Sequence, residues 1–247
     1  MLVTAVSERA DLCAQALDSL LARIDVKPVR LLVHEDEKQG STAGELARYL
    51  QSVPVAAVWH RVTSPARGLG PAVWQLLQAA TTPIVLYTQD DWLTLRDLPV
   101  RRALRLMERH DLHHIAFGKR TTPAAKHPGM PDEWRKAVRM FDGQPLTVAQ
   151  MWRAQASLWR VDRILPFFHR LVEADSEPDR WAMVKVNRWM NETFTGDVHG
   201  NDHDDRAEKL RTFLWGGIGE PAFIEHTGGE RRAELQSIEH YRTRSGR

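Results

Sequence analysis

The sequence predicts an α/β fold with a mostly parallel central sheet and helices on both of its faces. Short apolar runs rich in β-branched residues alternate with segments whose apolar residues recur every three or four positions. That alternation is typical of strands followed by amphipathic helices, and successive βαβ units give a parallel sheet. A length of 247 residues suits one large α/β domain.

The apolar pattern in the first half of the chain predicts four strands separated by three helices. Pro71 suits the first position of the third helix, and Thr42 with Glu45 resembles a capping box for the second. The strands are expected at 3–6, 29–33, 55–58 and 83–87, and the helices at 12–24, 42–50 and 72–80.

The second half follows a less regular pattern. A stretch rich in Pro, Gly and charged residues, 121–143, is expected to be a long connection with one short helix. A polar loop is expected at 195–206, either as a solvated segment or as a lid that donor binding orders. Helices are expected at 99–110, 164–173 and 179–194, and strands at 114–117, 157–160 and 222–225.

The composition is that of a soluble globular protein, with 43% hydrophobic and 27% charged residues. No apolar run approaches the roughly 20 residues that span a bilayer, and the first residues lack the pattern of a secretory signal. The single cysteine, Cys13, excludes an intramolecular disulfide and fits a reducing compartment. We therefore expect a cytoplasmic protein that does not act at a membrane. Its oligomeric state is left open.

Polar clusters follow the four strands of the first half. Ligands of parallel sheets bind at the carboxyl ends of the strands, so the clusters are expected to meet in one crevice. Two adjacent aspartates after a buried strand are costly unless their charge is neutralised, and Mg²⁺ or Mn²⁺ suits carboxylate ligands. The alternative is a turn-capping aspartate beside a solvated one. The clusters are Ser7-Glu8-Arg9, Glu35-Asp36, His60-Arg61 and Asp90-Asp91.

Three segments, 3–23, 68–80 and 84–92, resemble the nucleotide-binding half of GT-A-fold glycosyltransferases, particularly the family-2-like group. The resemblance implies transfer of a sugar from a nucleoside-diphosphate sugar, with a UDP-sugar favoured, to a hydroxyl acceptor, with Mn²⁺ or Mg²⁺ as cofactor. Residues 1–95 would bind the donor and 96–247 the acceptor within one domain. The implied donor-binding residues are Ala5, Ser7, Arg9, Glu35, Asp36, Arg67, Gln89 and Asp90.

The resemblance also implies a metal site and a catalytic base. Where the family usually has Asp-x-Asp, this chain has Gln89-Asp90-Asp91, and Asp91 is favoured as the metal ligand. The late histidine that such enzymes recruit matches His226. Asp179 would be the general base of an inverting enzyme, or alternatively only a helix N-cap. The run Gly216–Gly219 could form a flap over the diphosphate.

The acceptor prediction rests on charge. Between Arg96 and Arg139 there are eleven Lys or Arg against five Asp or Glu, and the tail 240–247 is also basic. Such a surface indicates a polyanionic acceptor bound in a salt-dependent manner. The alternative is a solvated helix face paired with Glu108.

Compact GT-A-like enzymes of bacterial viruses, which glycosylate hydroxymethylated bases such as 5-hydroxymethylcytosine in DNA, are similar in size and basicity. In that case the protein would act in a bacterial host cell on a flipped base. The predicted acceptor contacts are Trp134, Trp152, Trp181, Arg101 and Arg105.

Other readings of the sequence stay open. The acceptor could instead be a surface polysaccharide, a protein or a small metabolite. A nucleotidyltransferase also pairs carboxylates with a metal, but it normally has a basic Gly-rich loop after the first strand, and Ser7-Glu8-Arg9 is not one. The third class is a non-catalytic nucleic-acid-binding domain in which Asp90 and Asp91 are structural.

Overall fold

The computed structural model describes most of the chain. Residue-level description covers 1–37, 44–63, 68–118, 138–149, 155–173, 186, 189–190, 193, 209–217 and 220–227. Several predicted features lie outside these residues: Arg67, Trp134, Trp152, Asp179, Trp181, the loop 195–206 and the tail 240–247. No helix in the described part is both long and apolar enough to cross a membrane.

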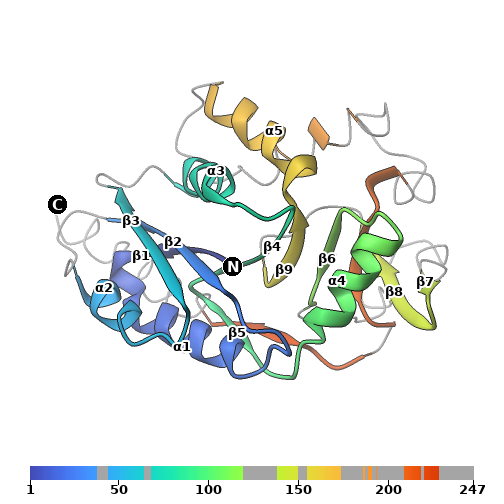
Figure 1. The fold of residues 1–247 in the computed structure, drawn as a ribbon, viewed down its shortest axis with the longest axis horizontal. Helices are drawn as coiled ribbons and strands as arrows, with labels where there is room; N and C mark the ends of the chain where they lie inside the picture. The colour runs from blue at the N-terminus through green and yellow to red at the C-terminus, as the bar shows by residue number, and fades with distance from the viewer. Residues whose placement is uncertain are drawn as a thin grey trace, which may run out of the picture.

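A nine-stranded mixed sheet forms the centre of the protein, in the order β3-β2-β1-β4-β9-β6-β10-β8-β7 (Figure 1). The first four strands are parallel, β9 is antiparallel to both of its neighbours, and β10 is parallel to β6. This confirms the predicted α/β class. The strands are β1 (Leu2–Val6), β2 (Arg30–Asp36), β3 (Ala57–Thr63), β4 (Ile84–Gln89), β6 (His114–Ala116), β7 (Val138–Phe141), β8 (Gln144–Val148), β9 (Ser157–Arg160) and β10 (Thr212–Trp215).

Helices cover both faces of the sheet, as predicted. In Figure 1, α3 and α5 lie above the sheet, and α1 and α2 lie below it. Apolar residues of α4 share a buried cluster with Leu20 of α1, so α4 belongs to the lower layer. The helices are α1 (Ala10–Leu21), α2 (Glu45–Leu50), α3 (Leu69–Ala79), α4 (Val100–Arg109) and α5 (Val161–Glu173).

Strands β1, β2 and β4 are largely buried, which explains the apolar runs in their sequences. Leu2 and Leu32 belong to the core under α3 and α5, whereas Val3, Leu31 and Val33 belong to the core under α1 and α2. The side chains therefore alternate between the two layers with the period of two that a strand imposes.

A short second ribbon positions the end of the described chain. Strand β5 (Trp92–Thr94) pairs antiparallel with β11 (Ile224–His226), and His226 lies opposite Trp92. Because β5 begins three residues after the end of β4, this pairing brings His226 beside the Asp90-Asp91 pair.

Several local expectations were wrong in detail. Strands β2 and β3 extend farther than predicted, so His34, Glu35 and His60 lie inside strands and not after them. Helix α2 begins after Gly44, which has φ 98° and no side-chain cap, so the expected capping box does not open it. Residues 138–143 belong to the hairpin β7–β8 and not to an irregular connection.

Candidate functional site

Asp90 and Asp91 directly follow β4, at the edge where β1, β2 and β4 all end; we call this the carboxyl edge. Both residues are buried, with exposed fractions of 4% and 8%. The amide of Asp90 donates to the Thr4 carbonyl at 3.0 Å, and its carboxylate Oδ2 accepts from the Val6 amide at 2.9 Å. The first aspartate therefore joins the end of β4 to the end of β1.

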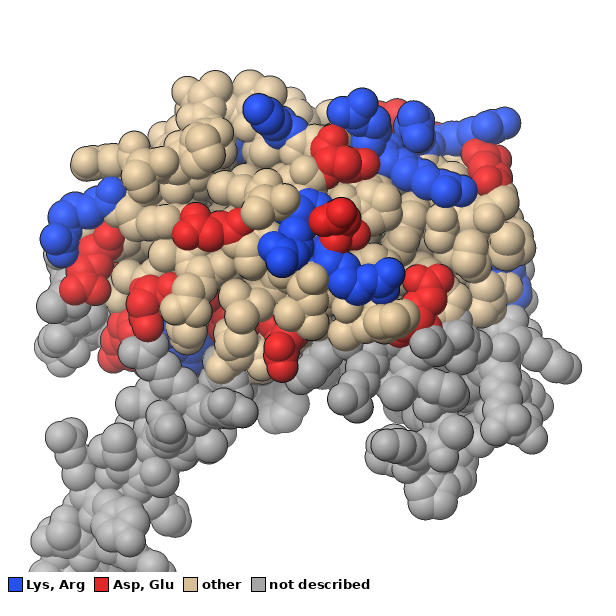
Figure 2. Space-filling model, turned by 90° about the horizontal axis from the view of Figure 1, so that it is seen from below, with Lys and Arg blue, Asp and Glu red and all other residues tan. Residues whose placement is uncertain are grey.

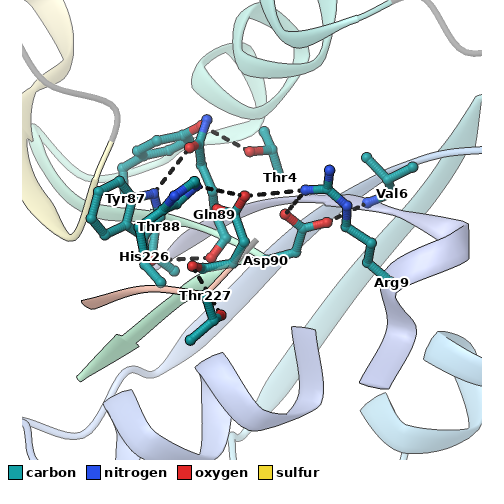
Figure 3. Close-up of polar contacts among 11 residues, drawn as sticks. Thr4, Val6, Arg9, Tyr87, Thr88, Gln89, Asp90, His226 and Thr227 are labelled. Atoms are coloured by element: carbon teal, nitrogen blue, oxygen red, sulfur yellow. Dashed lines mark hydrogen bonds and ion pairs between the residues drawn. The ribbon is translucent and has the colours of Figure 1, made fainter. Parts of the chain in front are cut away.

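Arg9 lies between the two carboxylates (Figure 3). It ends the 3₁₀ turn Ser7–Arg9 that connects β1 to α1. Its Nη1 is 3.1 Å from Asp91 Oδ2 and 3.7 Å from Asp90 Oδ1. Arg9, which the resemblance implies as a donor-binding residue for the nucleobase and ribose, thus contacts the aspartate pair itself.

His226 joins the same group from the far end of the sequence. Its Nε2 is 3.0 Å from Asp91 Oδ2, and its ring centroid is 4.7 Å from that of Trp92. The Thr227 amide and hydroxyl donate to the Asp91 carbonyl at 2.9 and 3.2 Å. Backbone and side chain of the β11 end therefore both hold Asp91.

The site has too little positive charge for its carboxylates. Burial, followed by the neighbouring Asp91 charge, raises the pKa of Asp90 to about 7, although Arg9 acts in the opposite direction. Oδ1 of Asp91 is buried and has no hydrogen-bond partner among the described residues. An unpaired buried acceptor of this kind is costly, so a further cation at Asp91 would be stabilising.

Asp91 and His226 have the donor atoms that a divalent cation needs. Carboxylate oxygen and imidazole nitrogen together suit Mn²⁺, and diphosphate oxygens commonly complete such sites. Among the residues described, no three His, Cys, Asp or Glu side chains gather as a metal-binding group. A cation held by Asp91 and His226 would therefore need further ligands, such as the oxygens of a diphosphate.

The other polar strand ends also meet at the carboxyl edge. Glu35 Oε2 contacts His60 Nε2 at 2.7 Å, and this hydrogen bond is the main cause that lowers the pKa of Glu35. Asp36 Oδ2 accepts from the Gly68 amide, just before α3, at 2.9 Å. The Ser7 hydroxyl donates to the Asp36 carbonyl at 3.4 Å. The polar groups that were predicted to line a crevice thus already bond to one another.

Two predicted donor-binding residues have structural partners. Ala5 is 4% exposed and belongs to the core between the sheet and helices α1 and α2. The Gln89 side chain accepts a hydrogen bond from Trp92 Nε1 at 3.2 Å. Their roles in donor binding stay predictions.

In the half predicted to bind the acceptor, α4 carries Arg101, Arg102, Arg105 and Arg109 of the basic segment. The Arg101 guanidinium donates to the Asp25 carbonyl at 3.1 Å, and its amide to the Asp25 carboxylate, so this arginine is already engaged. A cavity of about 560 Å³ lies along α4, lined by Arg102, Arg105, Leu106, Glu108, Arg109 and Asp142. Figure 2, seen from this face, shows basic side chains with acidic ones interspersed.

Sequence reasoning missed the groups that hold the site in place. The Val6 amide, His60 as a partner of Glu35, and Thr227 were not predicted. A backbone donor has no sequence signature. His60 did have one, because the clusters His60-Arg61 and Glu35-Asp36 were expected to meet, although their hydrogen bond was not specified.

Solved structures share this fold. No known protein-family profile matches the chain, and no curated protein sequence matches it. TarS of S. aureus has a TM-score of 0.52 at 13% identity over 92% of this chain. A shorter TarS fragment, in complex with UDP-GlcNAc, has a TM-score of 0.50 at 14% identity over 92%.

A third similar structure is the mannosyltransferase PcManGT of Pyrobaculum calidifontis, in complex with GDP-Man and Mn²⁺. Its TM-score is 0.52 at 17% identity over 86% of this chain. The chain spans only 36%, 60% and 55% of the three structures in the order given. At these identities the likeness establishes the fold, which is the α/β fold of the GT-A type.

Proposed function

We propose that this protein is a metal-dependent glycosyltransferase that moves a sugar from a nucleoside-diphosphate sugar to a hydroxyl group. The observation that carries the proposal is the contact between Asp91 and His226 at the end of β4, beside an Asp91 oxygen that is buried without a partner. The ligands named for the similar structures, UDP-GlcNAc and GDP-Man with Mn²⁺, support this donor class. A UDP-sugar is the favoured donor.

In this proposal, the residues of the site bind the donor through a cation and through an arginine. Asp91 and His226 would hold the cation, and Arg9 adds a second positive charge next to them. The cation supplies neutralisation of the negative charge that develops on the leaving diphosphate. In the proposal, Asp179 removes the proton from the attacking hydroxyl, as an inverting reaction requires.

The test is release of nucleoside diphosphate from UDP- and GDP-sugars with Mn²⁺ and candidate acceptors. Asp91→Asn should lower turnover by at least about 100-fold, because it removes the carboxylate that would hold the cation against the charge developing in the transition state. The midpoint of thermal unfolding should change little. Asp97→Asn removes an exposed carboxylate nearby and is the matched control. Full activity of Asp91→Asn would disprove the metal assignment, and release of pyrophosphate would indicate a nucleotidyltransferase.

For the acceptor, we propose DNA that carries hydroxymethylated bases, with surface polysaccharide, protein and small metabolites as the alternatives. The support is the α4 cavity, in which Arg102, Arg105 and Arg109 lie three and four residues apart on the same side of the helix. Arg109 is paired with Asp142 at 3.1 Å. Arg102 and Arg105 are exposed and remain available for phosphate groups.

The DNA proposal is tested by measuring duplex binding across a salt series. Binding should weaken steeply as salt rises, and Arg102→Gln with Arg105→Gln should reduce both the affinity and the salt slope. Arg48→Gln, which removes an exposed arginine of α2, should change neither. If the wild-type protein does not bind duplex DNA at low salt, the acceptor is one of the alternatives.

A further inference from the structure

The two neighbouring aspartates differ in what their oxygens contact. Oδ1 of Asp91 is without a partner, and its Oδ2 faces His226 and Arg9. In Asp90, by contrast, Oδ2 accepts the Val6 amide and Oδ1 faces Arg9. Asp91 therefore has an oxygen available for a cation, whereas both oxygens of Asp90 point to the turn that follows β1.

We infer that Asp90 is a positioning residue that fixes Arg9 as the anchor for the donor's diphosphate, while Asp91 alone of the pair binds the metal. The inference rests on the proposed function and deepens it. In this inference, Arg9 binds the phosphates of the donor and not its nucleobase and ribose. Asp90 contacts neither the metal nor the sugar nucleotide.

Asp90 holds the turn at two points three residues apart. Its carboxylate fixes the Val6 backbone at one end of the turn and attracts the Arg9 guanidinium at the other (Figure 3). Asp90 is only 4% exposed, so water weakens these contacts little. Because the whole turn between them is the three-residue segment Ser7–Arg9, a single carboxylate restricts both its backbone and its charged side chain.

Arg9 keeps binding capacity for a second anion. Both of its ion pairs use the same atom, Nη1. A guanidinium has five N–H donors in a planar fork. The donors on Nη2 and Nε of Arg9 bond to none of the described residues, because its contacts use Nη1. The side chain is 20% exposed, which leaves it accessible. A fork with one side fixed by carboxylates matches a phosphate group on its other side.

The test uses the full chain and three probes: UDP, uridine and Mn²⁺. Calorimetry in EDTA measures UDP and uridine binding, and electron paramagnetic resonance measures Mn²⁺ binding at a UDP concentration that saturates each variant. Arg9→Gln should weaken UDP binding by about tenfold or more, the size of one charge-assisted hydrogen bond, and leave uridine binding unchanged. Arg9→Lys, which keeps the charge but not the fork, should recover part of the loss.

Asp90→Asn keeps the size of the side chain and an acceptor for the Val6 amide but removes the charge that attracts Arg9. It should weaken UDP binding as Arg9→Gln does, and the double variant should be no weaker than Arg9→Gln alone. Its Mn²⁺ affinity should stay within about threefold of wild type, whereas Asp91→Asn should lose Mn²⁺ binding. In the steady state, the KM for the donor should rise more than kcat falls.

Three results would overturn the inference: additive losses in the double variant, loss of uridine binding by Arg9→Gln, or loss of Mn²⁺ binding by Asp90→Asn as large as that of Asp91→Asn. If Asp90→Asn fails to fold, as its circular dichroism would show, Arg9→Gln with UDP and uridine still decides. A wild-type protein that binds neither UDP nor GDP with Mn²⁺ would disprove the proposed function itself, which is a different outcome.

Discussion

At the scale of single residues, hydrogen bonds between buried side chains hold the carboxyl edge in shape. Thr4 Oγ1 and the Tyr87 hydroxyl lie 2.8 Å apart, and Tyr87 is fully buried. Burial also raises the pKa of Tyr87 well above its ordinary value, so the ring stays neutral. This pair connects β1 and β4 three residues before Asp90, and it therefore contributes to the geometry of the site.

Removing the Tyr87 hydroxyl should leave the Thr4 hydroxyl buried without this partner. Tyr87→Phe is expected to lower the free energy of unfolding by about 1–2 kcal/mol, as for other buried polar groups that lose a partner. Adding Thr4→Val should restore part of the loss. Urea unfolding gives both values, and Tyr49→Phe, whose hydroxyl bonds an exposed Asp18, is the control with a smaller expected effect. A double variant less stable than Tyr87→Phe would contradict the explanation.

At the scale of elements, the hairpin β7–β8 depends on its two-residue loop. Asp142 has φ 49° and Gly143 has φ 76°. Two consecutive positive values characterise the tight turns that match the twist of a hairpin, and Asp-Gly is a frequent sequence for them. Asp142 also forms an ion pair with Arg109 at the end of α4, and its carboxylate lies 3.2 Å from His110 Nε2. The turn therefore closes the hairpin and attaches it to the helix.

Gly143→Ala should destabilise the protein by about 1 kcal/mol, because a side chain at positive φ is strained. No atom lies within 4 Å of the position that the added Cβ would take, so crowding makes no contribution. Gly217→Ala is the control, since its φ is ordinary and its nearest neighbour would be 3.8 Å away. Chemical denaturation measures both, and equal effects of the two changes would contradict backbone strain as the cause.

The regular elements of the first half could be predicted because each has a clear local pattern. The central apolar residues of β1, β2 and β4 and the spacing in α1 and α3 were sufficient. The carboxyl ends of β2 and β3 could not be predicted, because polar residues there continue the strand pairing. Asp36, for example, lies opposite both Val6 and Thr63. The hairpin β7–β8 was missed although Asp142-Gly143 is itself a turn signal.

At the scale of the whole molecule, acid should destabilise the protein through its buried histidines. Burial lowers the pKa of His113 from 6.5 to about 4, and the residue is 5% exposed. Between pH 6.5 and 4 the unfolded chain therefore binds a proton that the folded protein does not. Stability falls as pH falls through this window. The raised pKa of Asp90 acts in the opposite direction.

A variant of His113 separates the effect of this histidine on the pH dependence of stability from that of Asp90. Between pH 7 and pH 5, His113→Gln should lose about 2 kcal/mol less unfolding free energy than wild type, since it lacks this proton uptake. His169→Gln removes a histidine whose side chain is 53% exposed and should follow the wild-type pH dependence. Urea unfolding at the two pH values is the measurement. A His113→Gln protein with the wild-type pH slope would show that this residue is not the cause.

The composition of the site was predictable in part. Asp90, Asp91, Arg9 and His226 were named from strand ends and resemblance, and the structure brings them together. The resemblance implied that Asp91 and His226 share a site, but it did not predict the β5–β11 ribbon, which joins residues about 130 positions apart. Which aspartate faces the turn and which faces His226 also depends on backbone geometry and not on residue type.

The antiparallel strand β9 has a consequence for how the protein is made. Its four residues fill the space between β4 and β6, although the chain has left β4 about 70 residues earlier. Until the ribosome has delivered residue 160, Leu86 and Tyr87 lie along an open strand edge, which is a site of unwanted pairing between nascent chains. Synthesis of residues 1–95 is therefore completed well before the edge of β4 is protected, and a chain stopped before β9 should aggregate.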